Sequence, residues 1–330
     1  MKRLKLIFAV SFLSIIIFLT GCKNNDNSVA PEPKSQVKIG TTASPKAQFG
    51  LKKQMNRLQK AGINTAELDA FFSLGWTSYP VYDSAAVSNE IYSFGYAGAF
   101  NNTNYRNLDM GDVAVSYGLE KTKFFKYEYD YTYQDEEGNE VTEKDIFYDL
   151  YNFPMTEEEI MNDDFSVEEV KIPYLGGQDY NFTATGSSEF SSVSISVAAP
   201  AEQLKITEPK SGAEVDLGQT LTVKWQGGQG TNKLFLSVYP MLDWENISDD
   251  DWETIFEQFE FEFGFFKEID AGTGEYTLTT EEMKSISNNK YVNGLFIDVY
   301  NYNVVENNDS GRNVVAEIHL GNSVEASIKK

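Results

Sequence analysis

The sequence predicts an all-β protein with two tandem β-sandwich domains that follow a short N-terminal helical segment. The first observation is an alternation of apolar and polar residues with period two, which begins near Tyr79 and is typical of half-buried strands. The second is that Gly, Asn, Asp and Pro separate the alternating stretches, as turns between strands require. The third is a length of 330 residues, which is enough for two domains, with an aromatic content of 14% that argues against general disorder.

The N-terminal stretch MKRLKLIFAVSFLSIIIFLTGC has the features of a secretory signal peptide. Its basic n-region consists of Lys2, Arg3 and Lys5. The apolar run Leu6–Leu19 is too short for a comfortable membrane span. Leu19-Thr20-Gly21-Cys22 resembles the lipobox of bacterial lipoproteins, in which the cysteine is diacylated and the peptide is cut before it. The resemblance implies a signal peptide over residues 1–21 and a lipid on Cys22; the alternative is an ordinary signal peptide or anchor with an incidental cysteine.

Polar residues follow the signal peptide and predict a flexible tether over residues 22–44. A helical segment is expected over residues 45–78. Within it, apolar residues at i, i+4 and i+7 predict an amphipathic helix with a basic face at Pro45–Lys60, and the capping-box pattern Asn64-x-x-Glu67 predicts a short helix at Thr65–Leu74. The basic helix either lies near acidic lipid headgroups or packs on the next domain with its lysines in water.

The first β-sandwich domain is expected over residues 79–200. Its predicted strands are 86–95, 111–117, 124–133, 145–151, 179–186 and 190–199. A short helix capped by Thr156-x-x-Glu159 is expected as a loop insertion.

The second β-sandwich domain is expected over residues 201–330, because a strand ends before Pro200 and a new one begins shortly after it. The stretch ITEPKSGAEVDLGQTLTVKWQGG resembles the opening of bacterial immunoglobulin-like modules. The matching residues are Pro209, Gly212, Val215, Gly218, Leu221, Val223 and Trp225. The resemblance implies an immunoglobulin-like sandwich with Trp225 in its core, although the two cysteines that flank such a Trp in antibody domains are missing.

The remaining strands of the second domain follow the same alternation of apolar and polar residues. They are expected at 204–207, 219–225, 233–239, 259–269, 275–279, 295–302, 313–320 and 324–328. Two helical insertions are expected between them, one opened by Ser248-x-x-Asp251 and one capped by Thr279-x-x-Glu282.

Charge and cysteine content exclude several classes of protein. The chain has 50 acidic and 27 basic residues and a net charge of −23, so nucleic acid is not an expected partner. Cys22 is the single cysteine, so neither a disulfide framework nor a cysteine-ligated metal site is expected.

The sequence carries no signature of a known catalytic centre. His319 is the single histidine, so a Ser-His-Asp triad, a Cys-His pair and an ordinary zinc site are not expected, and we interpret His319 as structural. No Walker loop or dinucleotide-binding Gly motif follows a strand, and no cofactor is predicted. The enzyme alternative is an extracellular glycan-active hydrolase with a carboxylate pair, but no spacing singles out such a pair.

Three loops rich in Asp, Glu or Asn are candidates for weak calcium binding: 135–139, 249–251 and 307–311. None of them has the ligand spacing of an EF-hand, and no metal site is predicted from them. The simpler interpretation is that they are solvated turns.

Tyrosines share one face of the predicted strand FFKYEYDYTY. They are Tyr127, Tyr129, Tyr131 and Tyr133. Exposed aromatic rings on a sheet can stack on sugar rings, so these four are candidate glycan-binding residues. The alternative is that they form the core or rim of the first sandwich.

These observations together predict a non-catalytic lipoprotein of the cell envelope that acts as a surface binding, adhesion or structural module. The expected partners are the membrane, through the lipid on Cys22, and a cell-surface glycan or protein. Lys23, not Asp, follows the lipidated residue, so the inner-membrane retention that Asp signals in some bacteria is not indicated and the outer membrane is the expected location.

Overall fold

The computed structural model describes most of the chain from Leu68 onward. The described ranges are 68–83, 86–101, 107–134, 140–152, 168–228, 233–243, 247, 264–286, 290–307 and 312–329. Within them strands dominate, and the helical elements are the short η3 (Ala271–Thr273) and α5 (Thr280–Ser285). The all-β sandwich class predicted from the sequence is therefore confirmed. Neither of these two helices is long or apolar enough to cross a bilayer.

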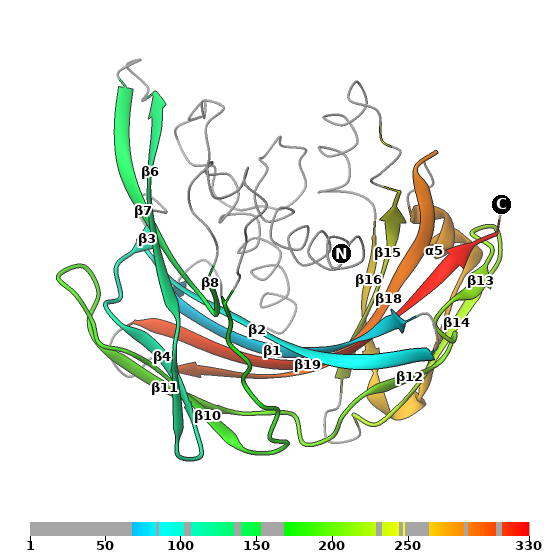
Figure 1. Ribbon diagram of the computed structural model, residues 1–330, viewed down its shortest axis with the longest axis horizontal. Coiled ribbons are helices and arrows are strands. Elements are labelled where there is room, and N and C mark those ends of the chain that lie inside the picture. Colours follow the sequence, from blue (N-terminus) through cyan, green and yellow to red (C-terminus); the bar gives the residue numbers. More distant parts are fainter. Residues whose placement is uncertain are drawn as a thin grey trace.

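A broad central sheet connects the two halves of the chain. Its strands are β1 (Leu68–Asp83), β2 (Ala86–Phe100), β3 (Asn107–Leu108), β6 (Phe125–Gln134), β7 (Glu140–Asp149), β13 (Ala213–Val215), β15 (Lys233–Leu242), β16 (Phe265–Asp270), β18 (Val292–Asn307) and β19 (Asn313–Ile328). The order across the sheet is β16-β15-β18-β19-β1-β2-β7-β6, while β13 pairs with β19 and β3 pairs with β2. Figure 1 shows this sheet as a curved layer whose two ends rise on the same side.

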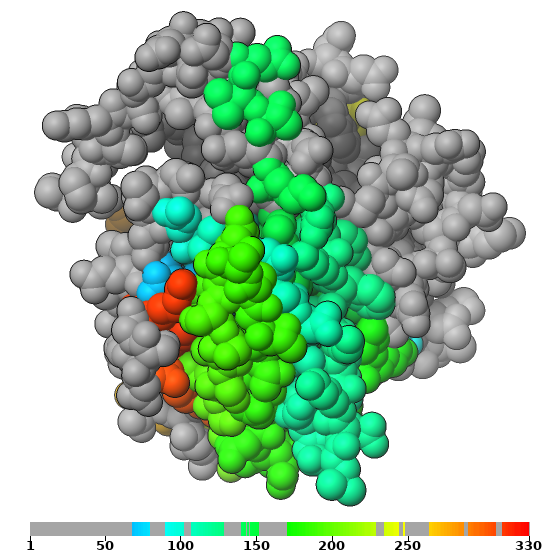
Figure 2. Space-filling view, turned by 90° about the vertical axis from the view of Figure 1, so that its left-hand side faces the viewer, coloured from blue at the N-terminus to red at the C-terminus, as the bar shows by residue number. Residues whose placement is uncertain are grey.

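Two small sheets pack on the outer side of the curve, one at each end (Figure 1). The first has the order β11-β10-β4-β5 and the second β12-β14-β17. Their strands are β4 (Val113–Tyr117), β5 (Glu120–Lys123), β10 (Asp179–Ala184), β11 (Val193–Ala198), β12 (Lys205–Glu208), β14 (Leu221–Gln226) and β17 (Glu275–Leu278). Figure 2 shows the first small sheet from outside, with the later strands in green beside the earlier ones in teal. A separate pair is formed by β8 (Tyr151–Asn152) and β9 (Glu168–Glu169).

The first core lies between the central sheet and the four-stranded sheet. Phe72 and Trp76 point from β1 toward Phe182 and Tyr180 of β10, with ring centroids 5.6 Å apart for the Phe pair and 5.2 Å for Trp76 and Tyr180. All four side chains are at most 1% exposed. Burial of aromatic side chains is a dominant stabilising contribution in such a sandwich.

The second core lies between the other end of the central sheet and the three-stranded sheet. Val223 and Trp225 of β14 pack there with Leu236 of β15 and Val299 of β18. Trp225 is 4% exposed, so the structure confirms that it is a core residue, as the immunoglobulin-like resemblance implied.

Strand β19 belongs to both cores. It pairs in parallel with β1 and antiparallel with β18, and every residue from Asn313 to Val324 is buried. Ile318 packs in the first core, whereas Ala326 packs in the second. The two sandwiches therefore share a sheet.

The boundary predicted at Pro200 falls between the two cores. In the chain before β19, the first core ends at Ala199 and the second begins at Leu204. Strand β19 completes both cores, so the position of the boundary does not show that residues 201–330 fold alone. Their independent folding stays a prediction.

The helical segment predicted over residues 45–78 is wrong for its last part, because residues 68–78 belong to the long strand β1. The stretch LDAFFSLGW has apolar residues at every second position from Leu68 to Trp76, and those from Ala70 to Trp76 face the first core. Leu68 packs in a smaller cluster with Phe71. Phe71 is also fully buried, on the opposite face of the sheet, which obscures the alternation in the sequence. The predicted helix at Pro45–Lys60 and the tether lie outside the described residues.

Most other elements agree with the sequence prediction. The capping box at Thr279 and Glu282 is present and opens α5, as predicted. The strands predicted at 313–320 and 324–328 are one continuous strand, because Gly321 and Asn322 continue the pairing instead of forming a turn. The insertions near Thr156 and Ser248 lie outside the described residues.

Candidate functional site

A pocket of about 330 Å³ opens beside the segment that connects the two cores. Its described lining residues are Trp76, Ile91, Ser93, Lys171, Ile172, Pro173, Tyr174 and Gln203. They come from β1, from β2, from the segment before β10 and from the connection between the cores. The pocket therefore depends on four parts of the chain that only the folded sheet brings together. We call it the connection pocket.

Three hydrogen bonds fix the back of the connection pocket. The indole Nε1 of Trp76 donates to the carbonyl of Ile172 at 2.7 Å. The backbone N–H of Ile172 donates to Ser93 Oγ at 3.1 Å, and this hydroxyl donates to the carbonyl of Val170 at 3.2 Å. Residues 170–172 are thus held against β1 and β2 although they form no strand there. Every polar atom in this set is used within the protein.

Tyr174 forms one wall of the connection pocket and keeps part of its ring exposed. Its ring meets Trp76 edge to face at 5.5 Å between centroids, and its hydroxyl donates to the carbonyl of Pro200 at 2.6 Å. Burial raises the pKa of this phenol, and the nearby carboxylate of Glu202 raises it further. Tyr174 is therefore a neutral, fixed aromatic side chain at physiological pH.

The open side of the connection pocket combines apolar and polar groups. Ile91 is 50% exposed, and Pro173, Lys171 and Gln203 are also exposed. No carboxylate stands among the described residues of this lining. An aromatic wall, an aliphatic side chain, an amide and an ammonium group are suited to binding a ligand.

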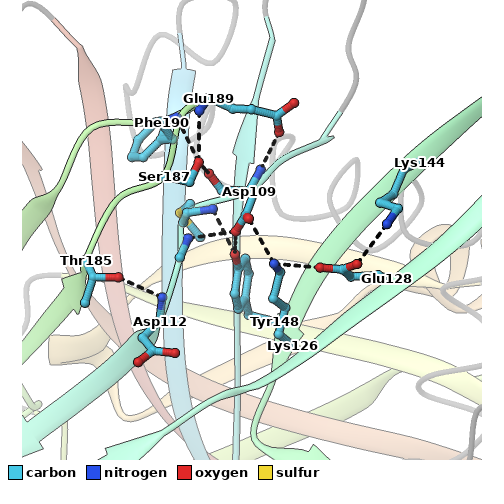
Figure 3. Close-up of polar contacts among 12 residues, drawn as sticks. Asp109, Asp112, Lys126, Glu128, Lys144, Tyr148, Thr185, Ser187, Glu189 and Phe190 are labelled. Atoms are coloured by element: carbon cyan, nitrogen blue, oxygen red, sulfur yellow. Dashed lines mark hydrogen bonds and ion pairs between the residues drawn. The ribbon is translucent and has the colours of Figure 1, made fainter.

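A second polar cluster surrounds Asp109, between β3 and β4 (Figure 3). Asp109 Oδ1 accepts hydrogen bonds from the backbone N–H of Gly111 at 2.7 Å and from the hydroxyl of Tyr148 at 2.8 Å. Its Oδ2 accepts from Lys126 Nζ at 2.9 Å. The Tyr148 hydroxyl also accepts from the backbone N–H of Met110, so this buried phenol is satisfied in both directions.

The cluster around Asp109 continues to the loop that joins β10 and β11. Ser187 Oγ donates to the carbonyl of Asp109 at 2.6 Å, and the backbone N–H of Asp109 donates to Glu189 at 3.0 Å. On the opposite side, Lys126 and Lys144 both pair with Glu128, at 2.6 and 3.0 Å. Figure 3 shows these side chains converging from the two sheets.

The ionisation of the Asp109 cluster indicates a structural role. Burial alone raises the pKa of Asp109, but hydrogen bonds from Lys126, Gly111 and Tyr148 outweigh it and hold this pKa below its usual range. Burial and the Asp109 carboxylate raise the pKa of Tyr148. A carboxylate that stays ionised and a phenol that stays neutral join two sheets and offer no proton near pH 7.

His319 is buried on the inner face of β19 and not in an open site. Its side chain is 7% exposed, and Nδ1 lies 3.2 Å from Oε1 of the fully buried Glu317. The imidazole lies against the backbone of Gly75, where any Cβ would overlap it, and its ring centroid is 4.7 Å from that of Phe94. This arrangement supports the structural interpretation of His319.

Asp149, at the end of β7, is a carboxyl with a strongly raised pKa. Burial raises its pKa to about 7, against the lowering effect of hydrogen bonds from the backbone N–H groups of Tyr151 and Leu150. The bond from Tyr151 to Oδ1 is 2.8 Å long. The causes of the shift do not include a second carboxyl of the described residues.

We expect Asp149→Asn to change the pH dependence of stability. An unfolded Asp has a pKa of about 3.9, so the higher folded value makes protonation favour the folded state. The contribution is complete below about pH 4 and is lost as the pH rises toward 7. At pH 8 the variant should be more stable than the wild type, because Asn places no charge at this buried position. We expect a gain of about 1–2 kcal/mol, since the partial exposure of Asp149 reduces the cost of its charge.

The measurement is urea unfolding of both proteins between pH 4 and pH 8. The matched control is Asp216→Asn, because Asp216 also accepts a backbone N–H, from Gly218, but is exposed. Parallel stability profiles for wild type and Asp149→Asn would contradict the prediction.

The residues predicted as candidate sites are placed only in part. Tyr127 is 5% exposed, its ring stacks on Phe147 with centroids 4.8 Å apart, and its hydroxyl donates to the carbonyl of Tyr151. Its ring is therefore packed in the protein, which agrees with the core-or-rim interpretation and contradicts glycan stacking at this residue. For Tyr129, Tyr131 and Tyr133 the backbone continues β6, while their side chains lie outside the description.

Other predictions about sites concern residues that the structure does not describe. These are Cys22, the loops 135–139 and 249–251, and residues 308–311 of the third candidate loop. Among the described residues no group of His, Cys, Asp and Glu is arranged to hold a metal ion.

Comparisons with known proteins do not place this chain in a family. No family model matches it, and no curated protein matches it. A solved structure that aligns with it is the yeast delta-COP-I mu-homology domain, with 79% of this chain and 98% of that chain covered at 7% identity. The TM-score of 0.21 is too low to support a shared fold or function.

Proposed function

We propose that this protein is a non-catalytic cell-envelope lipoprotein, anchored in the outer membrane through a lipid on Cys22, that binds a partner at the cell surface. The observation that carries the binding role is the connection pocket, with a fixed aromatic wall and exposed Ile91 and Gln203. The lipobox motif supports the anchor, and the net charge of −23 supports a surface that repels other anionic polymers. Adhesion and a structural role are variants of the same proposal, with a protein or glycan as the bound partner.

One observation favours the alternative of a glycan-active hydrolase. Asp149 has a pKa of about 7, which suits a general acid. A hydrolase also needs a second carboxyl within about 5–10 Å, and the shift of Asp149 is explained by burial and backbone contacts. We therefore favour binding.

The binding proposal can be tested with the purified full-length lipoprotein in detergent. We expect retention of a subset of glycans on an array, without release of reducing ends from those glycans in solution. Release of reducing ends that disappears in Asp149→Asn would establish the hydrolase instead.

We expect Cys22→Ser to abolish lipidation and to leave the signal peptide largely uncut. The reason is that processing at a lipobox acts on the diacylated cysteine, and this cysteine is the single one in the sequence. The measurement is metabolic labelling with a clickable fatty acid, read on the purified protein. The matched control is Ser28→Ala, a nearby change that leaves the motif intact. Equal label on wild type and Cys22→Ser would contradict the lipid anchor.

A further inference from the structure

From the geometry of the connection pocket, we infer that it binds a neutral pyranose ring of a surface glycan. This inference rests on the proposed binding function and gives it a ligand class and a site. It also moves the glycan site away from the tyrosine row of β6, where the Tyr127 ring is packed against Phe147.

The pocket offers one apolar surface to a ligand. Ile91 is 50% exposed, Pro173 is exposed, and the ring of Tyr174 is partly exposed beside them. Leu175, which directly follows Tyr174, is 37% exposed. One face of a pyranose carries mainly C–H groups, and such a face packs well on an aromatic or aliphatic surface.

The polar groups of the pocket are arranged at its rim. Behind the apolar surface, Trp76 Nε1, Ser93 Oγ and the Tyr174 hydroxyl are all engaged within the protein. Gln203 is exposed at the rim, and within the described part of the chain its amide has no hydrogen-bond partner. An amide offers two donors and an acceptor, which match two neighbouring hydroxyls on one edge of a sugar ring.

Size and charge restrict the ligand further. A volume of about 330 Å³ lies at the lower end of the range for ligand pockets, about 300–1,000 Å³, so one or two rings are expected. The net charge of −23 disfavours an anionic ligand, since the field of the whole protein opposes its approach and the single ammonium of Lys171 in the lining offsets this field only locally. A purely apolar ligand would form no hydrogen bond with the Gln203 amide. A neutral sugar satisfies both the apolar surface and the polar rim.

The test is a titration of the full-length lipoprotein in detergent with four probes. Binding is measured by calorimetry and by saturation-transfer NMR. The sugars are methyl β-glucopyranoside, methyl N-acetyl-β-glucosaminide and cellobiose, and the apolar probe is N-acetyl-leucinamide. At least one sugar should bind saturably. Gln203→Ala should weaken it about five- to tenfold, because a hydrogen bond to the ligand is lost without harm to the fold.

Matched controls separate the pocket from general effects. Gln219→Ala changes an exposed Gln outside the pocket, and Leu119→Ala changes a fully exposed Leu on the β4–β5 hairpin. Both should keep the wild-type affinity within about twofold, whereas Ile91→Ala should weaken sugar binding about three- to tenfold.

Three results would overturn the inference, and they bear differently on the proposed function. Sugar binding that Gln203→Ala and Ile91→Ala leave unchanged would place the glycan site elsewhere and keep the binding function. Saturable binding of N-acetyl-leucinamide without any sugar would make the pocket a site for an apolar side chain of a protein partner. If the wild-type protein carries no fatty-acid label at Cys22 and binds none of the four probes, the proposed function itself is contradicted.

Discussion

Trp225→Ala should lower the free energy of unfolding of the full-length protein by about 3–5 kcal/mol. Trp225 is 4% exposed in the second core, and the surrounding strands of two sheets cannot close fully over the cavity that Ala would leave. A loss of this size is a large part of the roughly 5–15 kcal/mol that stabilises a typical domain. Urea unfolding followed by circular dichroism measures it.

The indole nitrogen of Trp225 provides a control for this prediction. Within the described residues Nε1 has no hydrogen-bond partner, so the side chain contributes mainly through its volume. Trp225→Phe should therefore cost much less than Trp225→Ala, about 1–2 kcal/mol. Equal losses for the two variants would show that the contribution of Trp225 does not come from filling the core.

Gly75→Ala should destabilise the protein by about 2–3 kcal/mol through overpacking. A Cβ on residue 75 would overlap the imidazole of His319, which is itself confined by Phe94 and by the buried Glu317. In a His319→Ala background the same change should cost less than about 0.5 kcal/mol, because the obstructing ring is gone. Urea unfolding of the four proteins in this double-mutant cycle gives the coupling.

The control for the cycle is Gly98→Ala on the neighbouring strand β2. There the nearest atom to a new Cβ is the Phe100 ring at 3.2 Å, and no histidine is near. Gly98→Ala should show no coupling to His319→Ala. If Gly75→Ala costs the same with and without the imidazole, close packing on His319 is not the reason for glycine at position 75.

The sequence predicts the fold class and most strands because alternation along one strand is a local property. Val223 and Trp225 alternate with polar residues, and this pattern alone identifies β14 as a half-buried strand. Strand β1 was missed because it is buried on both faces around Phe71 and Phe72, where period two is lost. Glu317 and His319 are buried because β19 is covered on both faces. The burial of a polar residue in such a strand cannot be predicted from composition.

The connection pocket could not be predicted from the sequence, because its residues share no local pattern. Trp76 and Ser93 are direct partners in the pairing of β1 with β2, but Gln203 lies far from them in the chain. Residues 170–174 pack on these two strands and complete the lining. Alternation identified the tyrosine row on β6 but left open whether it binds glycans or forms the core or rim, because alternation does not tell which face of a strand meets solvent. Tyr127 shows this, since its ring packs on Phe147.

The position of β19 between β1 and β18 has a consequence for how the protein reaches its folded state. The pairing of β1 with β19 includes a hydrogen bond from the backbone N–H of Asn313 to Asp69 Oδ2, between residues 244 positions apart in the chain. Contacts between such distant segments slow folding, because a long loop must close before they form. Ribosomes make β19 after every strand that it contacts, so the first core keeps an open seam until nearly all of the described chain is present. In the export that we propose for this chain, late pairing of β19 would delay compaction until translocation is almost finished and would keep the chain in the unfolded form that translocation needs.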